Sequence, residues 1–168
     1  MTPLIAGIAL FSGGFTAIDG TRHALADPKP AVLIFVMTEC PIVRGYVPEL
    51  KRLAAVKGTR IFLVHVDPAT TANDAKAFGK EYGLAYRAVL DKDHALVKRF
   101  KIEAVPTAVV LDAQGRAAYV GRIDDRYPSL GVQRKPRSRD LRDALDTVIA
   151  GRTIARRLPA IGCAVPDL

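Results

Sequence analysis

The two cysteines are the residues best suited to carry chemistry. Cys40 lies where the apolar run "AVLIFV" gives way to a helix-like pattern, within "VMTECPIVRGYVPEL". An ionised cysteine is the nucleophile toward peroxides and disulfides, and a helix N-terminus favours the thiolate through its free N–H groups and dipole. Pro41 suits the first position of such a helix, where its missing N–H would have no partner. The pattern predicts an activated thiol with a pKa below that of free cysteine.

The neighbours of Cys40 leave its chemistry open. Arg44 adds positive potential about one turn on, whereas the carboxylate of Glu39 disfavours a second negative charge. Val43 stands three residues after Cys40, so a local CxxC disulfide is excluded. The alternative interpretation is a buried structural thiol that packs as a small apolar side chain.

Short β-branched runs alternate with helical periodicities along the chain, which predicts an α/β fold. We expect a hairpin in "FTAIDGTRHAL", a first helix with its apolar face between residues 43 and 54, and a second hairpin made by residues 107–120. Further strands are expected at 31–36, 60–66 and 87–90. Further helices are expected at 71–82, from Asp93 to about 100, and at 138–150.

Length and composition limit the other function classes. The chain has 168 residues, and 49% of them are apolar, which predicts one domain with a packed core. The formal charge is +8, but the basic residues from Arg134 to Arg157 alternate with acids and apolar residues. This pattern is typical of a solvated helix face, so we expect no nucleic-acid partner.

The N-terminus has two interpretations. Residues 4–11 can form a short signal-peptide core, or residues from Phe15 can begin the first hairpin, and both hold if a signal ends near Gly13. No stretch is long enough for an integral membrane segment. We divide the chain into a signal remnant or extension at 1–14, a redox domain at 15–151, and a tail carrying Cys163 at 152–168.

Several segments resemble known redox proteins. "AVPTAVVLDAQGR" resembles the thioredoxin-fold segment in which a cis-proline, here Pro106, opens a hairpin, and Cys40 and Pro48 have the spacing of thioredoxin's active-site helix. "CPIVRGYVPEL", "VGRIDDRYPSLGVQRKPRSRDLRDAL" and "IGC" resemble exported bacterial redoxins related to peroxiredoxins and TlpA. The resemblance implies a thioredoxin fold with an inserted helix and strand, a central mixed sheet flanked by helices, and export to the periplasm. A cytoplasmic location is the alternative.

The resemblance also implies the site. Cys40 would be the reactive residue of a thiol-disulfide oxidoreductase or thiol peroxidase, with Thr38, Pro41, Val105 and Pro106 around its substrate. That substrate would be a protein thiol or disulfide, or a peroxide, and an external thiol would be the reductant. Thr38 stands two residues before Cys40, whereas typical peroxiredoxins have threonine three before.

Hairpin geometry suggests a role for Arg122. The strand leaving Pro106 and the strand returning from Arg116 have similar lengths, which brings Arg122 back level with the proline. It can stabilise the thiolate or bind an anionic oxygen. The alternative is a surface arginine paired with Asp124 or Asp125.

Cys163, in the irregular tail "LPAIGCAVPDL", is the other thiol of the chain and the candidate resolving residue for Cys40. Three alternatives stay open: a permanent structural disulfide, a shared metal site, and pairing with another chain. No resident cofactor is expected in the redox interpretation. In a non-catalytic alternative, Cys40, Cys163 and one histidine bind copper(I) and deliver metal or electrons to a partner.

Overall fold

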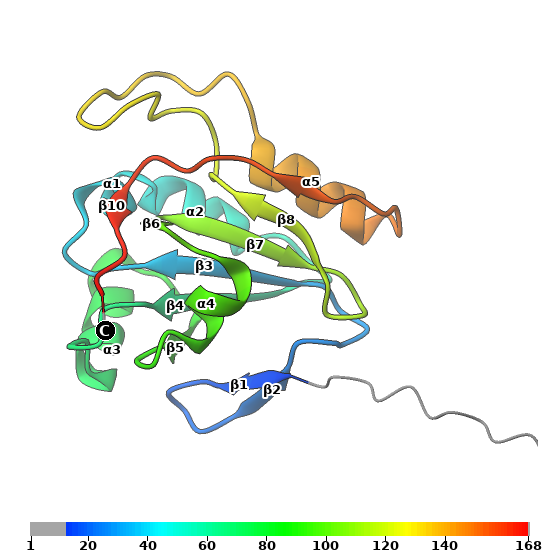
Figure 1. The fold of residues 1–168 in the computed structure, drawn as a ribbon, viewed down its shortest axis with the longest axis horizontal. Coiled ribbons are helices and arrows are strands. Elements are labelled where there is room, and N and C mark those ends of the chain that lie inside the picture. Colours follow the sequence, from blue (N-terminus) through cyan, green and yellow to red (C-terminus); the bar gives the residue numbers. More distant parts are fainter. Residues whose placement is uncertain (1–12, 168) are drawn as a thin grey trace, which may run out of the picture.

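A six-stranded mixed sheet forms the centre of the molecule in the computed structural model, which describes residues 13–167 (Figure 1). The strand order is β5-β4-β3-β7-β8-β9. The strands are β3 (Ala31–Val36), β4 (Arg60–His65), β5 (Arg87–Leu90), β7 (Thr107–Leu111), β8 (Ala117–Gly121) and β9 (Arg156–Arg157). β3 runs parallel to β4 and antiparallel to β7, and its six residues are all buried. The all-apolar run "AVLIFV" matches this central position, where both faces of the strand are covered.

Five helices pack around this sheet: α1 (Pro41–Gly45), α2 (Val47–Leu53), α3 (Ala72–Tyr82), α4 (Ala95–Phe100) and α5 (Asp140–Ile149). α2 and α5 are joined by Arg142, whose Nε donates to Glu49 at 2.6 Å. The predicted α/β fold, with its central mixed sheet flanked by helices, is confirmed. No helix within residues 13–167 is long and apolar enough to cross a membrane.

The predicted first helix is divided into two. Tyr46 lies between α1 and α2, and Pro48 occupies the first turn of α2. Because proline has no N–H, the hydrogen bond that would continue α1 toward the Arg44 carbonyl cannot form. The proline therefore breaks the helix that begins at Cys40.

The start of α4 also differs from the prediction. His94, in a left-handed conformation with φ of 55°, is the N-cap residue, rather than Asp93. The buried carboxylate of Asp91 accepts hydrogen bonds from the Leu96 and Val97 amides at 3.0 and 2.8 Å. These bonds satisfy two donors of the first helical turn, and the Asp93 carboxylate accepts from a third donor, the Ala95 amide, at 3.3 Å as its predicted role requires.

Both ends of the described chain form β-structure. β1 (Gly14–Thr16) and β2 (Arg22–Ala24) make the predicted hairpin, with Gly20 in the turn at a φ of 83°. The tail after α5, expected to be irregular, contributes β9 to the central sheet and then β10 (Cys163–Ala164). The signal-peptide core proposed for residues 4–11 lies outside the described residues.

Candidate redox site

Cys40 lies directly after β3 and is the N-cap residue of α1, with Pro41 in the first turn as predicted. Its side chain is 2% exposed, and its Sγ lies 3.7 Å from the Val105 carbonyl oxygen. The sulfur is therefore buried between the start of a helix and the segment that leads into Pro106.

Cys163 reaches this sulfur from the opposite end of the sequence. β10 pairs antiparallel with β6 (Ala104–Val105), so that Cys163 stands opposite Val105, and the Val165 amide donates to the Glu103 carbonyl at 3.0 Å. Figure 1 shows the red β10 at the end of the sheet where α1 begins. Cys40 and Cys163 form a disulfide with their Cα atoms 6.1 Å apart, across 123 residues of sequence. The structure thus brings together the two predicted cysteines.

The segment around Pro106 shapes the place where the tail lies. The Val105–Pro106 peptide bond is cis, Val105 is fully buried, and the Thr107 hydroxyl donates to the Ala104 carbonyl at 2.6 Å. A Cβ at Gly162 would overlap the Val105 carbonyl oxygen. The tail therefore approaches the backbone so closely that only glycine fits before the cysteine.

Thr38, Glu39 and Arg44 form a small polar group on the outer side of Cys40. Arg44 donates from Nε to the Thr38 carbonyl and from Nη2 to the Glu39 carboxylate, both at 3.1 Å. The two charges with opposing influence on Cys40 are therefore paired with each other. Thr38 takes part through its backbone, and Pro41 is exposed.

Arg122 follows β8, whose last residue, Gly121, pairs with Ala108. Its Nε donates to Asp140 at 2.8 Å, and this ion pair joins the end of β8 to the start of α5. The expected surface partners were Asp124 and Asp125, so the structure corrects that alternative. Among residues 13–167 no hydrogen bond links Arg122 to Cys40, and a role in thiol chemistry stays a prediction.

A buried ion pair that the sequence analysis did not identify supports α1. Arg126 pairs with Asp124 at 2.8 Å, and both side chains are less than 10% exposed. Arg126 also donates to the Gly45 carbonyl at 3.1 Å and lies 4.5 Å from the ring centre of Tyr46. The Tyr46 hydroxyl donates to the Asp124 carbonyl, and burial raises its pKa, so the phenol stays protonated. In the sequence Asp124 and Arg126 both belong to the charged segment "RIDDRY", in which no pattern indicates that they are buried.

The copper alternative requires a histidine beside the two cysteines. His65 is buried on β4, and the ring of His94 is hydrogen-bonded to the Val66 carbonyl at 2.7 Å. No group of three histidine, cysteine or acidic side chains suited to a metal ion occurs within residues 13–167. The side chains described therefore do not fit the proposed copper site.

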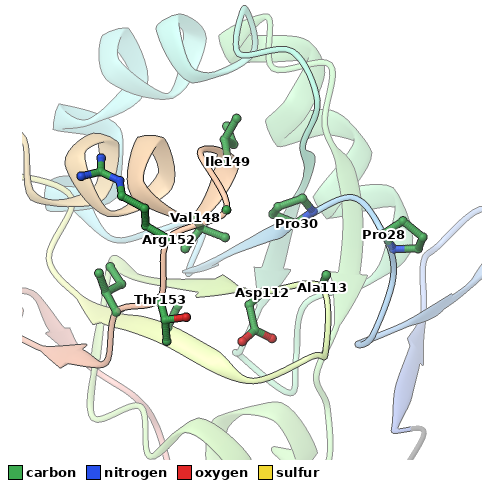
Figure 2. Close-up of a pocket in the computed structure, with 11 residues that line it drawn as sticks. Pro28, Pro30, Asp112, Ala113, Val148, Ile149, Arg152 and Thr153 are labelled. Atoms are coloured by element: carbon green, nitrogen blue, oxygen red, sulfur yellow. The ribbon is translucent and has the colours of Figure 1, made fainter.

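A pocket of about 250 Å³ lies at the other end of the sheet from the disulfide. Figure 2 shows Pro28 and Pro30 before β3 facing Val148 and Arg152 at the end of α5. None of the residues predicted for the redox site lines it.

A thioredoxin-like redoxin domain is the class that this fold and this cysteine position define. The AhpC/TSA family matches residues 15–120, and the chain belongs to that family. The methylamine utilization protein MauD of Methylobacillus flagellatus is 27% identical over 109 residues, which are 60% of this chain and 49% of that protein. The chain thus spans about half the length of this curated relative.

Two solved structures illustrate the likeness in fold. An uncharacterised conserved protein from Geobacillus kaustophilus superposes with a TM-score of 0.77 at 24% identity, covering 94% of this chain and 90% of that one. A secreted disulfide oxidoreductase of Mycobacterium tuberculosis, described as homologous to DsbE of Escherichia coli, has a TM-score of 0.56 at 20% identity. This match covers 83% of this chain and 96% of the oxidoreductase chain.

Proposed function

We propose that this protein is a thiol-disulfide oxidoreductase that cycles between the Cys40–Cys163 disulfide and the dithiol. The observation that supports this proposal best is the position of Cys163. Cys163 lies in the two-residue strand β10, which pairs with β6 just before Pro106, and it forms the disulfide with Cys40. A strand of two residues that lies outside the central sheet can leave β6 without disturbing that sheet, which makes a reversible bond structurally simple.

The exchange needs no cofactor. In one direction, the thiolate of a reduced partner attacks one sulfur of the Cys40–Cys163 disulfide, a mixed disulfide forms, and the other sulfur leaves as a thiolate. A second thiol of the partner then displaces the mixed disulfide. The partner is oxidised by two electrons, and both cysteines of this chain are reduced. In the reverse direction, Cys40 attacks a partner disulfide and Cys163 resolves the product.

The test is redox titration of the folded protein. Samples are equilibrated with mixtures of reduced and oxidised dithiothreitol, the thiols are trapped by alkylation, and intact masses are measured. We expect one transition in which both cysteines change together. Cys163→Ser is incubated separately with oxidised glutathione, and its Cys40 should form a mixed disulfide with glutathione. A disulfide that is reduced only after unfolding would contradict the proposal and leave a structural bond.

Reduced, unalkylated protein from which dithiothreitol has been removed tests the peroxidase alternative. If hydrogen peroxide oxidises Cys40, the thiolate attacks one oxygen, water leaves, and a sulfenic acid remains. Cys163 then condenses with it, releasing a second water and forming the disulfide. Rapid disulfide formation from one equivalent of peroxide would assign peroxidase activity. Slow formation beside fast dithiol exchange would assign the oxidoreductase activity alone.

We also infer that the protein works in an oxidising compartment outside the cytoplasm. A disulfide that closes the site persists where thiols are not kept reduced, and one solved relative is described as secreted. Fractionation of bacterial cells that express the full chain tests this inference. Recovery of the oxidised protein only from the cytoplasm would contradict it.

A further inference from the structure

The connection between β8 and α5 carries an exposed apolar tip. We call residues 126–138 the basic loop. Within residues 13–167 three large apolar side chains are strongly exposed, and two of them, Leu130 and Val132, lie in this loop at 68% and 49% exposure. Two such residues, separated only by Gly131 at the tip of a loop, are typical of an interaction site rather than of scattered surface residues.

The tip is surrounded by positive charge. Residues 126–139 contain five basic residues and no acidic residue. Arg126 and Arg134 are paired with Asp124 and Asp125 at the base of the loop. Lys135 and Arg137 are exposed and form no ion pair with any residue of the range 13–167. Their charges are therefore available to a partner.

The base of the loop is fixed by hydrogen bonds. The Asp125 carboxylate accepts from the Arg137 and Ser138 amides at 2.6 and 3.0 Å and from the Arg134 side chain at 2.5 Å. These bonds hold the pKa of Asp125 well below its usual range, so the carboxylate remains charged. Gly131 reverses the chain at the tip with a φ of 74°. The loop thus presents its apolar and cationic side chains from a supported base.

The basic loop also lies beside the redox site. Arg126 donates to the carbonyl of Gly45, the last residue of α1, and the ring centres of Tyr127 and Tyr46 are 5.3 Å apart. α1 begins immediately after Cys40. In Figure 1 the loop, in yellow, projects from the body on the side of α1 and β10. A protein that contacts the loop is therefore close to the disulfide.

We propose that the basic loop is the docking surface for an acidic redox partner protein, which places its reactive cysteine at the Cys40–Cys163 disulfide. The proposal rests on the proposed thiol-disulfide exchange and adds the partner's chemistry. Apolar side chains of the partner cover Leu130 and Val132, and carboxylates around them face Lys135 and Arg137. Charge complementarity of this kind raises association rates, while the apolar contact supplies burial.

The test uses two synthetic peptides of twelve residues as probes. Each contains one cysteine and two leucines. One peptide carries four glutamates, and the other has glutamine at those four positions. The measured quantity is the rate of mixed disulfide formation with the oxidised protein, followed by quenched-flow mass spectrometry. Each rate is divided by the rate of the same peptide with bis(2-hydroxyethyl) disulfide, a neutral compound, to remove differences in intrinsic thiol reactivity.

We expect the glutamate peptide to react about tenfold faster at low ionic strength, and the advantage to shrink as added salt screens the charges. Lys135→Glu combined with Arg137→Glu should abolish the advantage. Leu130→Ser combined with Val132→Ser should lower the rates of both peptides. The matched control is Lys57→Glu combined with Arg152→Glu, which reverses two exposed charges outside the loop and should keep the advantage.

Dithiothreitol separates failure of docking from failure of the proposed function. If dithiothreitol reduces every variant at the wild-type rate while the two peptides react equally, the docking proposal is wrong and the exchange chemistry stands. If the control variant lost the rate advantage of the glutamate peptide to the same extent, the docking proposal would also be wrong, because net charge alone would explain the effect. Loop-dependent binding of duplex DNA or of phosphatidylglycerol vesicles, with no difference between the peptides, would overturn it as well. If dithiothreitol fails to reduce the folded protein, the proposed function itself is wrong.

Discussion

Gly162 is the residue on which docking of the tail depends most directly. A Cβ at this position would overlap the Val105 carbonyl oxygen, and the backbone of Val105 is buried between Cys40 and the tail. No positive φ is involved at Gly162, so any effect of a side chain here comes from this close approach rather than from backbone strain. The glycine of "IGC" is therefore part of the candidate redox site, because the tail can pack there only without a side chain at this position.

We predict that Gly162→Ala shifts the equilibrium of the cysteine pair toward the dithiol. Forcing a methyl group into a packed contact costs about 1 to 3 kcal/mol, which is at least about a fivefold change in the equilibrium constant. The measurement is the oxidised fraction in dithiothreitol redox buffers. Ala155→Ser, at an exposed position of the same tail, is the control and should leave the equilibrium unchanged. An unchanged equilibrium in Gly162→Ala would show that the tail docks without this contact.

His65 is a second residue with a measurable signature. It is 1% exposed at the end of β4, packs edge-on against Phe78, and neither ring nitrogen has a hydrogen-bond partner within residues 13–167. Burial lowers its pKa from 6.5 to about 4. The native state therefore holds the neutral ring, whereas the unfolded chain binds a proton near pH 6.5.

We predict that His65 contributes to the loss of stability in acid. Its contribution is fully present above about pH 6.5 and is lost as the pH falls toward 4, and the shift corresponds to about 3 kcal/mol. In His65→Leu the free energy of unfolding, measured by urea titration, should fall less between pH 7 and pH 4 than in the wild type. Burial also lowers the pKa of His23, which is less buried, so His23→Leu is the comparison and should show a smaller effect of the same sign. Parallel pH profiles of His65→Leu and the wild type would contradict the prediction.

At the scale of elements, the sequence predicted best where a pattern repeats over several residues. The runs at β3 and β4 and the apolar hairpin of β7 and β8 are long enough for burial to show as hydrophobicity. β6 and β10 contain two residues each, too few for any periodicity, and their pairing depends on contacts far apart in the sequence. The two cysteines could be singled out by type, but the strand that joins them could not.

The buried ion pair that supports α1 was not predicted, for a related reason. Asp124 and Arg126 are charged residues in a charged stretch, and a single sequence does not reveal that both side chains are buried. The predicted partner of Arg122 was also wrong, because the actual partner, Asp140, lies at the start of α5 and is not close to Arg122 in the sequence. Ion pairs across elements follow from packing, which local patterns do not encode.

We predict that Arg126→Met destabilises the protein by about 3 to 5 kcal/mol, because it leaves the buried Asp124 carboxylate without its partner. It also removes the donor to the Gly45 carbonyl at the end of α1. The measurement is the free energy of unfolding from urea titration. Arg139→Met, in an exposed ion pair, should change it by less than about 1 kcal/mol. Asp124→Asn combined with Arg126→Met should recover part of the loss, and an effect of Arg126→Met as small as that of Arg139→Met would contradict a stabilising pair.

At the scale of the whole molecule, one bond connects the start of α1 to the C-terminal tail. Cys40 follows the central strand, and Cys163 lies at the end of a chain segment that passes along α5 and β9 before reaching β6 (Figure 1). The disulfide spans 123 residues and encloses β4, β7 and β8. Redox state and folding stability are therefore linked through the same pair of sulfur atoms.

We predict that reduction lowers the free energy of unfolding by up to about 4 to 5 kcal/mol, because the open chain regains the entropy that a loop of this length loses on closure. The measurement is a pair of urea titrations of the wild type, one oxidised and one in excess dithiothreitol. Cys163→Ser should match the reduced protein and should not respond to dithiothreitol. Because β10 is short and lies outside the central sheet, the reduced protein should remain folded, with amide hydrogen exchange increased at residues 104–105 and 163–165 and little changed in β3. Equal stability of the oxidised and reduced protein would show that the bond strains the native fold as much as it restricts the unfolded chain. Exchange that increases throughout the sheet would show that the bond holds the whole fold together, which is incompatible with a reversible redox cycle.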